Sequence, residues 1–286
     1  MKKERFDFVC SIGSSCLCAS SLRDSGLRLS SGPFDWLLGP SLLERAKLIA
    51  ADFSGWMEPG DFEFAGNPYN AIKENYRNLK TGYKFSHDFR AGADFAAEFP
   101  EVKGKYDRRV ARLYERVRAS KRVLFVWVEN PVNDDRPSDG EIAAARKVLM
   151  DKFPGVEIEL LVVDRAPDGS TSGNIVRGDG YWRATCPYRR KAAAPDKVIR
   201  PWDIDTHPIV ALLSNFATGD YRSADERRRH DDAQRNEKYA MYGASGPVSY
   251  AISRIQVKFC KKLMNGLRRK GADIRRLFDA QLGGFK

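Results

Sequence analysis

Two apolar runs on either side of one helical segment constrain the fold more than any other feature of this chain. Residues 122–128 (RVLFVWV) and 156–163 (VEIELLVV) have the length and composition of buried strands. Residues 139–153, between them, have the composition of a helix. A strand, a helix and a second strand in this order predict a parallel unit. We therefore expect an α/β fold in which helices flank a layered, largely parallel sheet.

The other segments extend this alternation of strands and helices. Residues 5–12 and 83–85 favour short strands, and residues 164–196 favour an irregular or hairpin region. Helices are expected at residues 17–26, 41–52, 106–119 and 209–216. Mixed charges between residues 223 and 238, followed by GASGP at 243–247, interrupt the pattern. We expect an α/β domain over residues 1–220, then a charged linker and a helical tail over residues 221–286.

Most of the net charge lies in that tail. The chain has 286 residues, 49 Lys+Arg and 38 Asp+Glu, for a net charge of +11. Residues 248–286 hold ten Lys/Arg and two acids, so they carry +8 and leave +3 for the rest. Apolar residues recur there at helical spacing, at Ile252, Ile255, Phe259, Leu263 and Leu267. The sequence predicts a basic amphipathic helix.

A basic amphipathic helix has two main roles. It docks on its own domain with a solvated basic face, or it binds an anionic membrane surface. Nucleic acid is not an expected partner, because no binding motif accompanies the charge. Five cysteines without a framework spacing, and no apolar run of 18 residues, favour a cytoplasmic protein. If residues 248–286 bind an anionic membrane surface, we expect peripheral association of the protein with the inner membrane.

A glycine-rich turn between a strand and a helix is the densest candidate site. Gly13, Ser14 and Ser15 lead from the first strand to Cys16, at the start of the next helix. A helix N-terminus stabilises a thiolate and lowers the pKa of a cysteine placed there. The N–H groups of Ser15 and Cys16 would stabilise an oxyanion in acyl transfer, with Ser14 and Ser15 close to substrate. The alternative is a small buried cysteine that packs a tight turn.

A cysteine nucleophile needs a base, and the chain has three histidines. His87 follows the strand predicted at 83–85, His207 precedes the helix predicted at 209–216, and His230 lies in the charged segment. We expect His230 to be solvated. We select His87 as the base, although a single histidine is more often structural than catalytic.

The remaining site residues are assigned from their positions. Asp88 neighbours His87, but successive strand residues face opposite ways, so Asp88 is a substrate contact rather than the group that orients the imidazole. Asp35 is the expected orienting acid, or else a turn or capping acid, and Trp36 would exclude water beside it. Arg23 would bind an anionic substrate group or pair with Asp24.

Four short blocks then point to a family. They are residues 11–16 (SIGSSC), 22–23 (LR), 33–36 (PFDW) and 85–89 (FSHDF). In this order they resemble an uncharacterised bacterial family described as papain-like cysteine peptidases, over roughly residues 6–165. The resemblance implies Cys16 as nucleophile, His87 as base and a link to cell-surface polysaccharide genes. The spacing departs from papain itself, whose histidine lies about 130–150 residues after the cysteine.

Two other interpretations use the same turn. In an SGNH-like serine esterase or acyltransferase, Ser15 attacks, His207 is the base, and Asp203 or Asp205 orients it. In a non-catalytic module, the turn binds a phosphate or sugar nucleotide, with Arg23 and the tail as further anion contacts. None of the three interpretations uses a cofactor. Cys16 and Cys18 with so few histidines do not form a metal signature, so no metal is expected.

Overall fold

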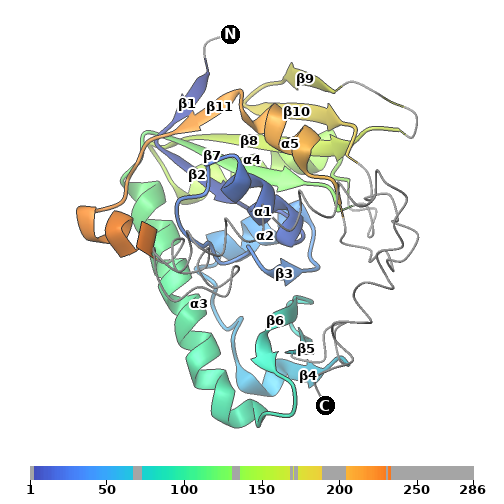
Figure 1. The fold of residues 1–286 in the computed structure, drawn as a ribbon, viewed down its shortest axis with the longest axis vertical. Coiled ribbons are helices and arrows are strands. Elements are labelled where there is room, and N and C mark those ends of the chain that lie inside the picture. Colours follow the sequence, from blue (N-terminus) through green and yellow to red (C-terminus); the bar gives the residue numbers. More distant parts are fainter. Residues whose placement is uncertain are drawn as a thin grey trace, which may run out of the picture. The chain divides into compact units, whose positions relative to one another are not determined.

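The computed structural model describes residues 3–66, 73–130, 136–167, 170, 173–188, 204–229 and 231–232 (Figure 1). The chain divides into two compact units, Met1–Tyr221 and Arg222–Lys286. Every helix and strand named below belongs to the first unit. The basic helix predicted within residues 248–286 lies outside the described residues. No helix in the described part of the chain is long and apolar enough to cross a membrane.

A five-stranded sheet forms the centre of the first unit. Its order is β2 (Phe8–Ser11), β7 (Arg122–Val128), β8 (Glu157–Arg165), β10 (Tyr181–Cys186) and β9 (Asn174–Arg177). The first four strands are parallel and β9 is antiparallel to β10. The α/β class is confirmed, with a mixed rather than a purely parallel sheet. The hairpin expected within residues 164–196 corresponds to β9 and β10.

Helices cover both faces of this sheet because its central strands are apolar on both sides. Val123, Phe125 and Trp127 of β7 pack into one buried cluster, and Leu124 and Val126 pack into the other. The first cluster includes α2 (Leu42–Ala50), α3 (Phe95–Arg118) and α4 (Asp139–Lys152). The second includes α1 (Cys16–Asp24) and α5 (His207–Leu213), which contact each other. Figure 1 shows α1 and α5 together on one side.

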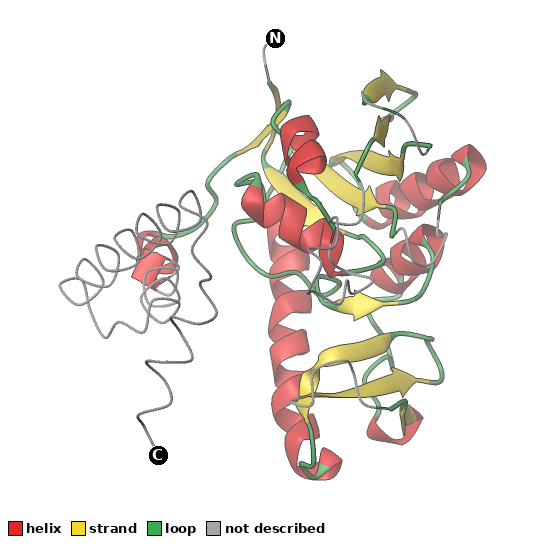
Figure 2. Cartoon of the chain, turned by 45° about the vertical axis from the view of Figure 1, so that its right-hand side comes forward, coloured by secondary structure: helices red, strands yellow, loops and turns green. Residues whose placement is uncertain are grey.

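A second, antiparallel sheet is the main feature that the sequence did not predict. Its order is β3 (Leu37–Leu38), β6 (Lys84–Arg90), β5 (Lys73–Asn78) and β4 (Phe62–Phe64), the last preceded by the single turn η1 (Pro59–Asp61). The strand predicted at 83–85 is the start of β6, which continues through His87. The long helix α3 runs beside this sheet and contacts β6 (Figure 2).

The strand predicted at residues 5–12 is interrupted at Asp7. Its first part, β1 (Glu4–Phe6), pairs in parallel with β11 (Phe216–Thr218) as a separate two-stranded sheet. The carboxylate of Asp7 accepts hydrogen bonds from the backbone N–H groups of Lys121 and Arg122, at 2.8 and 2.9 Å. The backbone N–H of Asp7 also donates to the carbonyl of Arg122 at 2.9 Å, so Asp7 lies at the point where the chain passes from β1 to β2. The interruption leaves β2 to enter the main sheet and end at the candidate site.

Candidate active site

The turn predicted between strand and helix joins β2 to α1. Gly13 is required there, because a Cβ atom at this position would lie 2.3 Å from Cβ of Cys18. Ser15 has extended backbone angles, and its hydroxyl accepts a hydrogen bond from the N–H of Leu17 at 3.4 Å. Ser15 is therefore the N-cap of α1. Cys16 is the first residue of the helix, as the sequence predicted.

The backbone around Cys16 offers hydrogen-bond donors. Among the described residues, no hydrogen bond to another residue uses the N–H groups of Ser14, Ser15 or Cys16, although the N–H of Cys16 lies close to its own sulfur. The first N–H groups of a helix have no partner within the helix, and they carry its positive dipole end. The hydroxyl of Ser14 is also buried without a hydrogen-bond partner. This arrangement suits a negatively charged oxygen atom.

Cys16 is partly buried, and its surroundings keep the thiol neutral. Burial raises the pKa of the Cys16 thiol, with a smaller opposing contribution from a backbone hydrogen bond. The sequence had suggested a lowered pKa at this helix N-terminus. In the resting structure the burial of the sulfur outweighs that effect, so the thiol must lose its proton to a base as it attacks. The described cysteines, Cys10, Cys16, Cys18 and Cys186, are all free thiols.

His87 lies on β6 and is held by an aromatic ring. Its imidazole packs edge-on against the indole of Trp36, with the ring centroids 5.6 Å apart. His87 is an exposed residue, and Trp36 covers part of its ring. Burial lowers the pKa of His87, Asp88 acts in the opposite direction, and Lys73 and Lys105 lower it further. A neutral imidazole at neutral pH can accept a proton.

Asp88 faces the other side of β6, as its position next to His87 predicted. Its carboxylate accepts a hydrogen bond from the hydroxyl of Tyr106 at 2.9 Å and pairs with the ammonium of Lys105. Both partners belong to α3. Asp88 thus joins β6 to α3, and its expected contact with substrate stays a prediction.

Asp35 is fully buried and paired with an arginine that the sequence analysis missed. Its Oδ2 accepts hydrogen bonds from Arg28 at 2.5 Å and from the N–H of Gly32 at 2.9 Å. Burial raises the pKa of Asp35, and the guanidinium of Arg28 is the strongest influence in the opposite direction. Arg28 also lies over the ring of Trp36, at 5.7 Å from its centroid. No motif or spacing in the sequence indicated Arg28.

The PFDW block connects the turn to the histidine. Burial raises the pKa of the Cys18 thiol to about 12, and the carboxylate of Asp35 nearby adds a smaller rise. The next residue, Trp36, contacts His87. Among the described residues, however, no hydrogen bond joins His87 to Cys16 or to Asp35. The roles of Cys16, His87 and Asp35 therefore stay predictions.

Arg23 and the residues of the serine interpretation lie in contrasting environments. Arg23 is exposed near the end of α1 and pairs with Asp24 at 3.0 Å. Ser15 is buried, whereas the side chain of His207 is 94% exposed and its Nδ1 lies 2.7 Å from Asp205.

Asp203 and His230 lie outside the described residues. No group of metal-binding side chains occurs among the residues that the structure describes.

Comparison with known proteins decides the family. Residues 7–162, more than half of the chain, match the model of the family described as "Putative papain-like cysteine peptidase (DUF1796)". The chain belongs to this family. The DUF1796 region contains β2, the turn, Cys16, Asp35 and His87 and ends within β8. The resemblance noted from the four sequence blocks is thereby confirmed at the level of the family.

A curated relative extends the comparison. An uncharacterized protein of Acanthamoeba polyphaga mimivirus is 27% identical over 132 residues, which cover 41% of this chain and 59% of that protein. The match thus spans about three fifths of the relative's length. This relative is viral, whereas the sequence blocks had suggested a bacterial family. No solved structure matches the chain.

Proposed function

We propose that this DUF1796 protein is a cysteine-dependent hydrolase or acyltransferase in which Cys16 is the nucleophile and His87 the general base. The observation that carries the proposal is the position of Cys16. It begins a helix after a parallel strand and a short glycine turn, beside backbone N–H groups that make no hydrogen bond to another described residue. Nucleophilic cysteines act at such positions because a helix N-terminus favours the thiolate that forms during attack and free N–H groups stabilise the oxyanion.

The chemistry follows from the protonation states. The imidazole of His87 accepts the proton of the Cys16 thiol as the sulfur attacks an acyl carbon. The oxyanion that forms accepts hydrogen bonds from the N–H groups of Ser15 and Cys16. When the bond to the leaving group breaks, the leaving group takes the proton from His87, and a thioester remains on Cys16. Water or another nucleophile then releases the acyl group.

Neighbouring residues are assigned supporting roles. Trp36 holds the ring of His87 and limits its access to water. Asp35 and Arg28 fix the loop that carries Trp36, through a buried ion pair. Ser14, Arg23 and Asp88 are kept as substrate contacts, with Arg23 suited to an anionic group on the exposed surface. A role in cell-surface polysaccharide metabolism rests on the family resemblance alone.

The experiment that tests the proposal is acetylation by p-nitrophenyl acetate, with the modified residue located by mass spectrometry. We expect an acetyl group on Cys16, release of p-nitrophenolate, and loss of both in Cys16→Ala. Cys18→Ala is the matched control, because Cys18 lies on the same helix but is fully buried. Acetylation that is equal in wild type and Cys16→Ala would contradict the proposal.

The serine esterase is retained as a second candidate because His207 is hydrogen-bonded to an acid. Its Nδ1 lies 2.7 Å from the carboxylate of Asp205. The histidine of a catalytic triad is oriented by an acid in the same way. Against it, the hydroxyl of Ser15 is buried and caps α1. In the same experiment, this candidate predicts acetyl-Ser15 that survives in Cys16→Ala and disappears in His207→Ala. No acyl adduct on either residue would favour the non-catalytic binding module.

A further inference from the structure

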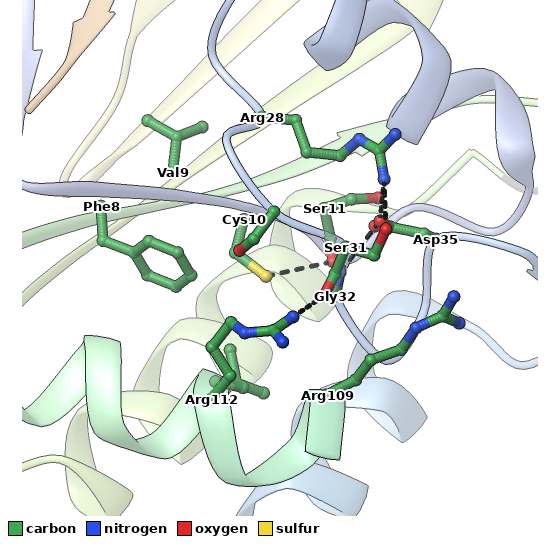
Figure 3. Close-up of a pocket in the computed structure, with 12 residues that line it drawn as sticks. Phe8, Val9, Cys10, Ser11, Arg28, Ser31, Gly32, Asp35, Arg109 and Arg112 are labelled. Atoms are coloured by element: carbon green, nitrogen blue, oxygen red, sulfur yellow. Dashed lines mark hydrogen bonds and ion pairs between the residues drawn. The ribbon is translucent and has the colours of Figure 1, made fainter. Parts of the chain in front are cut away.

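A pocket opens along β2, between the loop that follows α1 and helix α3 (Figure 3). The loop contributes Arg28, Ser31 and Asp35, and α3 contributes Arg109 and Arg112. These two arginines are three positions apart, so they lie on the same face of the helix. The space in and in front of this pocket that atoms do not fill is about 290 Å³, open solvent included, and its enclosed part has room for about one water molecule.

Several donors and acceptors in this pocket have no partner. Nε of Arg28, Nη1 of Arg109 and Oδ1 of Asp35 are buried without a hydrogen bond. The side chain of Arg28 is 10% exposed and that of Asp35 is 1% exposed. Arg109 makes no hydrogen bond to any described residue; its guanidinium lies over the ring of Tyr106, at 5.1 Å from the centroid, and is near enough to Asp35 to lower the pKa of that carboxyl against its burial. A buried donor without an acceptor is costly, so Nε of Arg28 and Nη1 of Arg109 would gain from an acceptor placed in the pocket.

The charge of the pocket indicates what that ligand is. Three arginines and one carboxylate line it, so its lining carries a net charge of two positive units. Arg28 already uses one Nη1 for Asp35 and for the hydroxyl of Ser31, and Arg112 donates to the carbonyl of Ser31 at 3.2 Å. Arg109 and the Nε of Arg28 remain to bind an acceptor.

We propose that this pocket binds a phosphate group as its dianion. A phosphate group carries between about −1.5 and −2 charges at pH 7 and three oxygen acceptors, which match the charge and the free donors of the arginine pocket. The planar guanidinium fork binds such oxygens in pairs, which a lysine cannot do. Phosphate binding at this pocket uses neither Cys16 nor His87, so the binding proposal can be tested independently of the proposed catalytic function.

The phosphate can be a free ion or part of an organic phosphate, and one experiment separates the two. We would titrate the full-length protein with inorganic phosphate and, separately, with glucose 1-phosphate, by isothermal calorimetry at constant ionic strength. Sodium chloride is the reference titrant. The variants are Arg109→Gln and Arg112→Gln, and the matched control is Arg108→Gln, an exposed arginine of the same helix. All three variants lose one positive charge.

We expect wild type to bind phosphate saturably. We expect this binding to weaken at least about tenfold in Arg109→Gln but not in Arg108→Gln. Arg112→Gln, which also weakens binding, provides a second test if Arg109→Gln does not fold. Tighter binding of glucose 1-phosphate would identify an organic phosphate, and equal or weaker binding would identify the free ion. The proposal is wrong if wild type does not bind either probe, or if Arg108→Gln loses as much affinity as the two pocket variants.

Discussion

Trp36 and His87 meet edge to face, with an angle of 68° between their rings. They come from distant parts of the chain, Trp36 just before β3 and His87 on β6, which pairs with β3. Edge-to-face contact fixes the orientation of a ring without using its polar atoms. In the part of the chain that the structure describes, this aromatic neighbour positions the imidazole, and no hydrogen bond joins His87 to an acid.

Removal of this contact should change the titration of His87. In Trp36→Ala the imidazole becomes more solvated, and because burial lowers its pKa, we expect the pKa to rise toward the ordinary value of 6.5. The imidazole C–H resonances in NMR spectra report this titration. The chain has three histidines, so His87→Ala assigns the signal. A pKa of His87 that is identical in wild type and Trp36→Ala would show that Trp36 does not desolvate the ring.

Alkylation by iodoacetamide should show that Cys16 is protonated at rest. Because burial raises the pKa of its thiol, the reaction rate should increase only at alkaline pH, with an apparent pKa above that of a free cysteine, about 8.5. A peptide that contains residues 11–21 with Cys18 replaced by serine is the solvated reference. Faster alkylation of the protein than of the peptide near pH 7 would instead show a preformed thiolate.

The turn before Cys16 should not accept a methyl group at Gly13. A Cβ atom there would overlap Cβ of Cys18 at 2.3 Å, so Gly13→Ala must displace α1 or the turn. We expect a loss of about 1–3 kcal/mol in the free energy of unfolding, measured with urea. Gly60→Ala is the control, because nothing lies within 4 Å of the added atom. Equal stability of the two variants would mean that the turn adapts freely.

The strands that the sequence predicted best are those in which side chains on both faces are buried. Residues 122–128 form β7 with the predicted bounds, because no polar residue interrupts their apolar run. Strand β5, by contrast, has the sequence KENYRN and is mostly half-buried. Its polar side chains carry no alternation, and pairing with β6 and β4 stabilises it. Local sequence patterns therefore did not predict most of the second sheet.

At the site, the sequence located Cys16 correctly but not the partners of Asp35. A strand, a glycine turn and a helix are local features, so the position of Cys16 at the start of α1 followed directly. The pairing of Asp35 with Arg28 and the inward direction of Asp88 toward α3 depend on tertiary contacts. The burial that raises the pKa of Cys16 is likewise a property of the folded chain.

If residues 248–286 bind membranes, binding of the protein to liposomes should depend on the negative charge of the lipid. Lys261→Gln combined with Lys262→Gln should weaken binding of the full-length protein to anionic liposomes at low salt by roughly tenfold or more, since each lysine contributes about 1 kcal/mol. Lys47→Gln with Lys147→Gln is the control, because both side chains are exposed within the first unit. Liposome sedimentation measures the bound fraction. If the two double variants bind as wild type does, residues 248–286 do not hold the protein at membranes.

The most direct test of the account is the rate at which p-nitrophenyl acetate acetylates Cys16 in His87→Ala and in His207→Ala, followed by mass spectrometry near pH 7. General-base catalysis contributes about 10²–10⁴-fold, so His87→Ala should lower the rate by at least about a hundredfold while His207→Ala leaves it unchanged. Acetylation of Cys16 at the wild-type rate in His87→Ala would contradict the account, and a loss confined to His207→Ala would assign the base to His207.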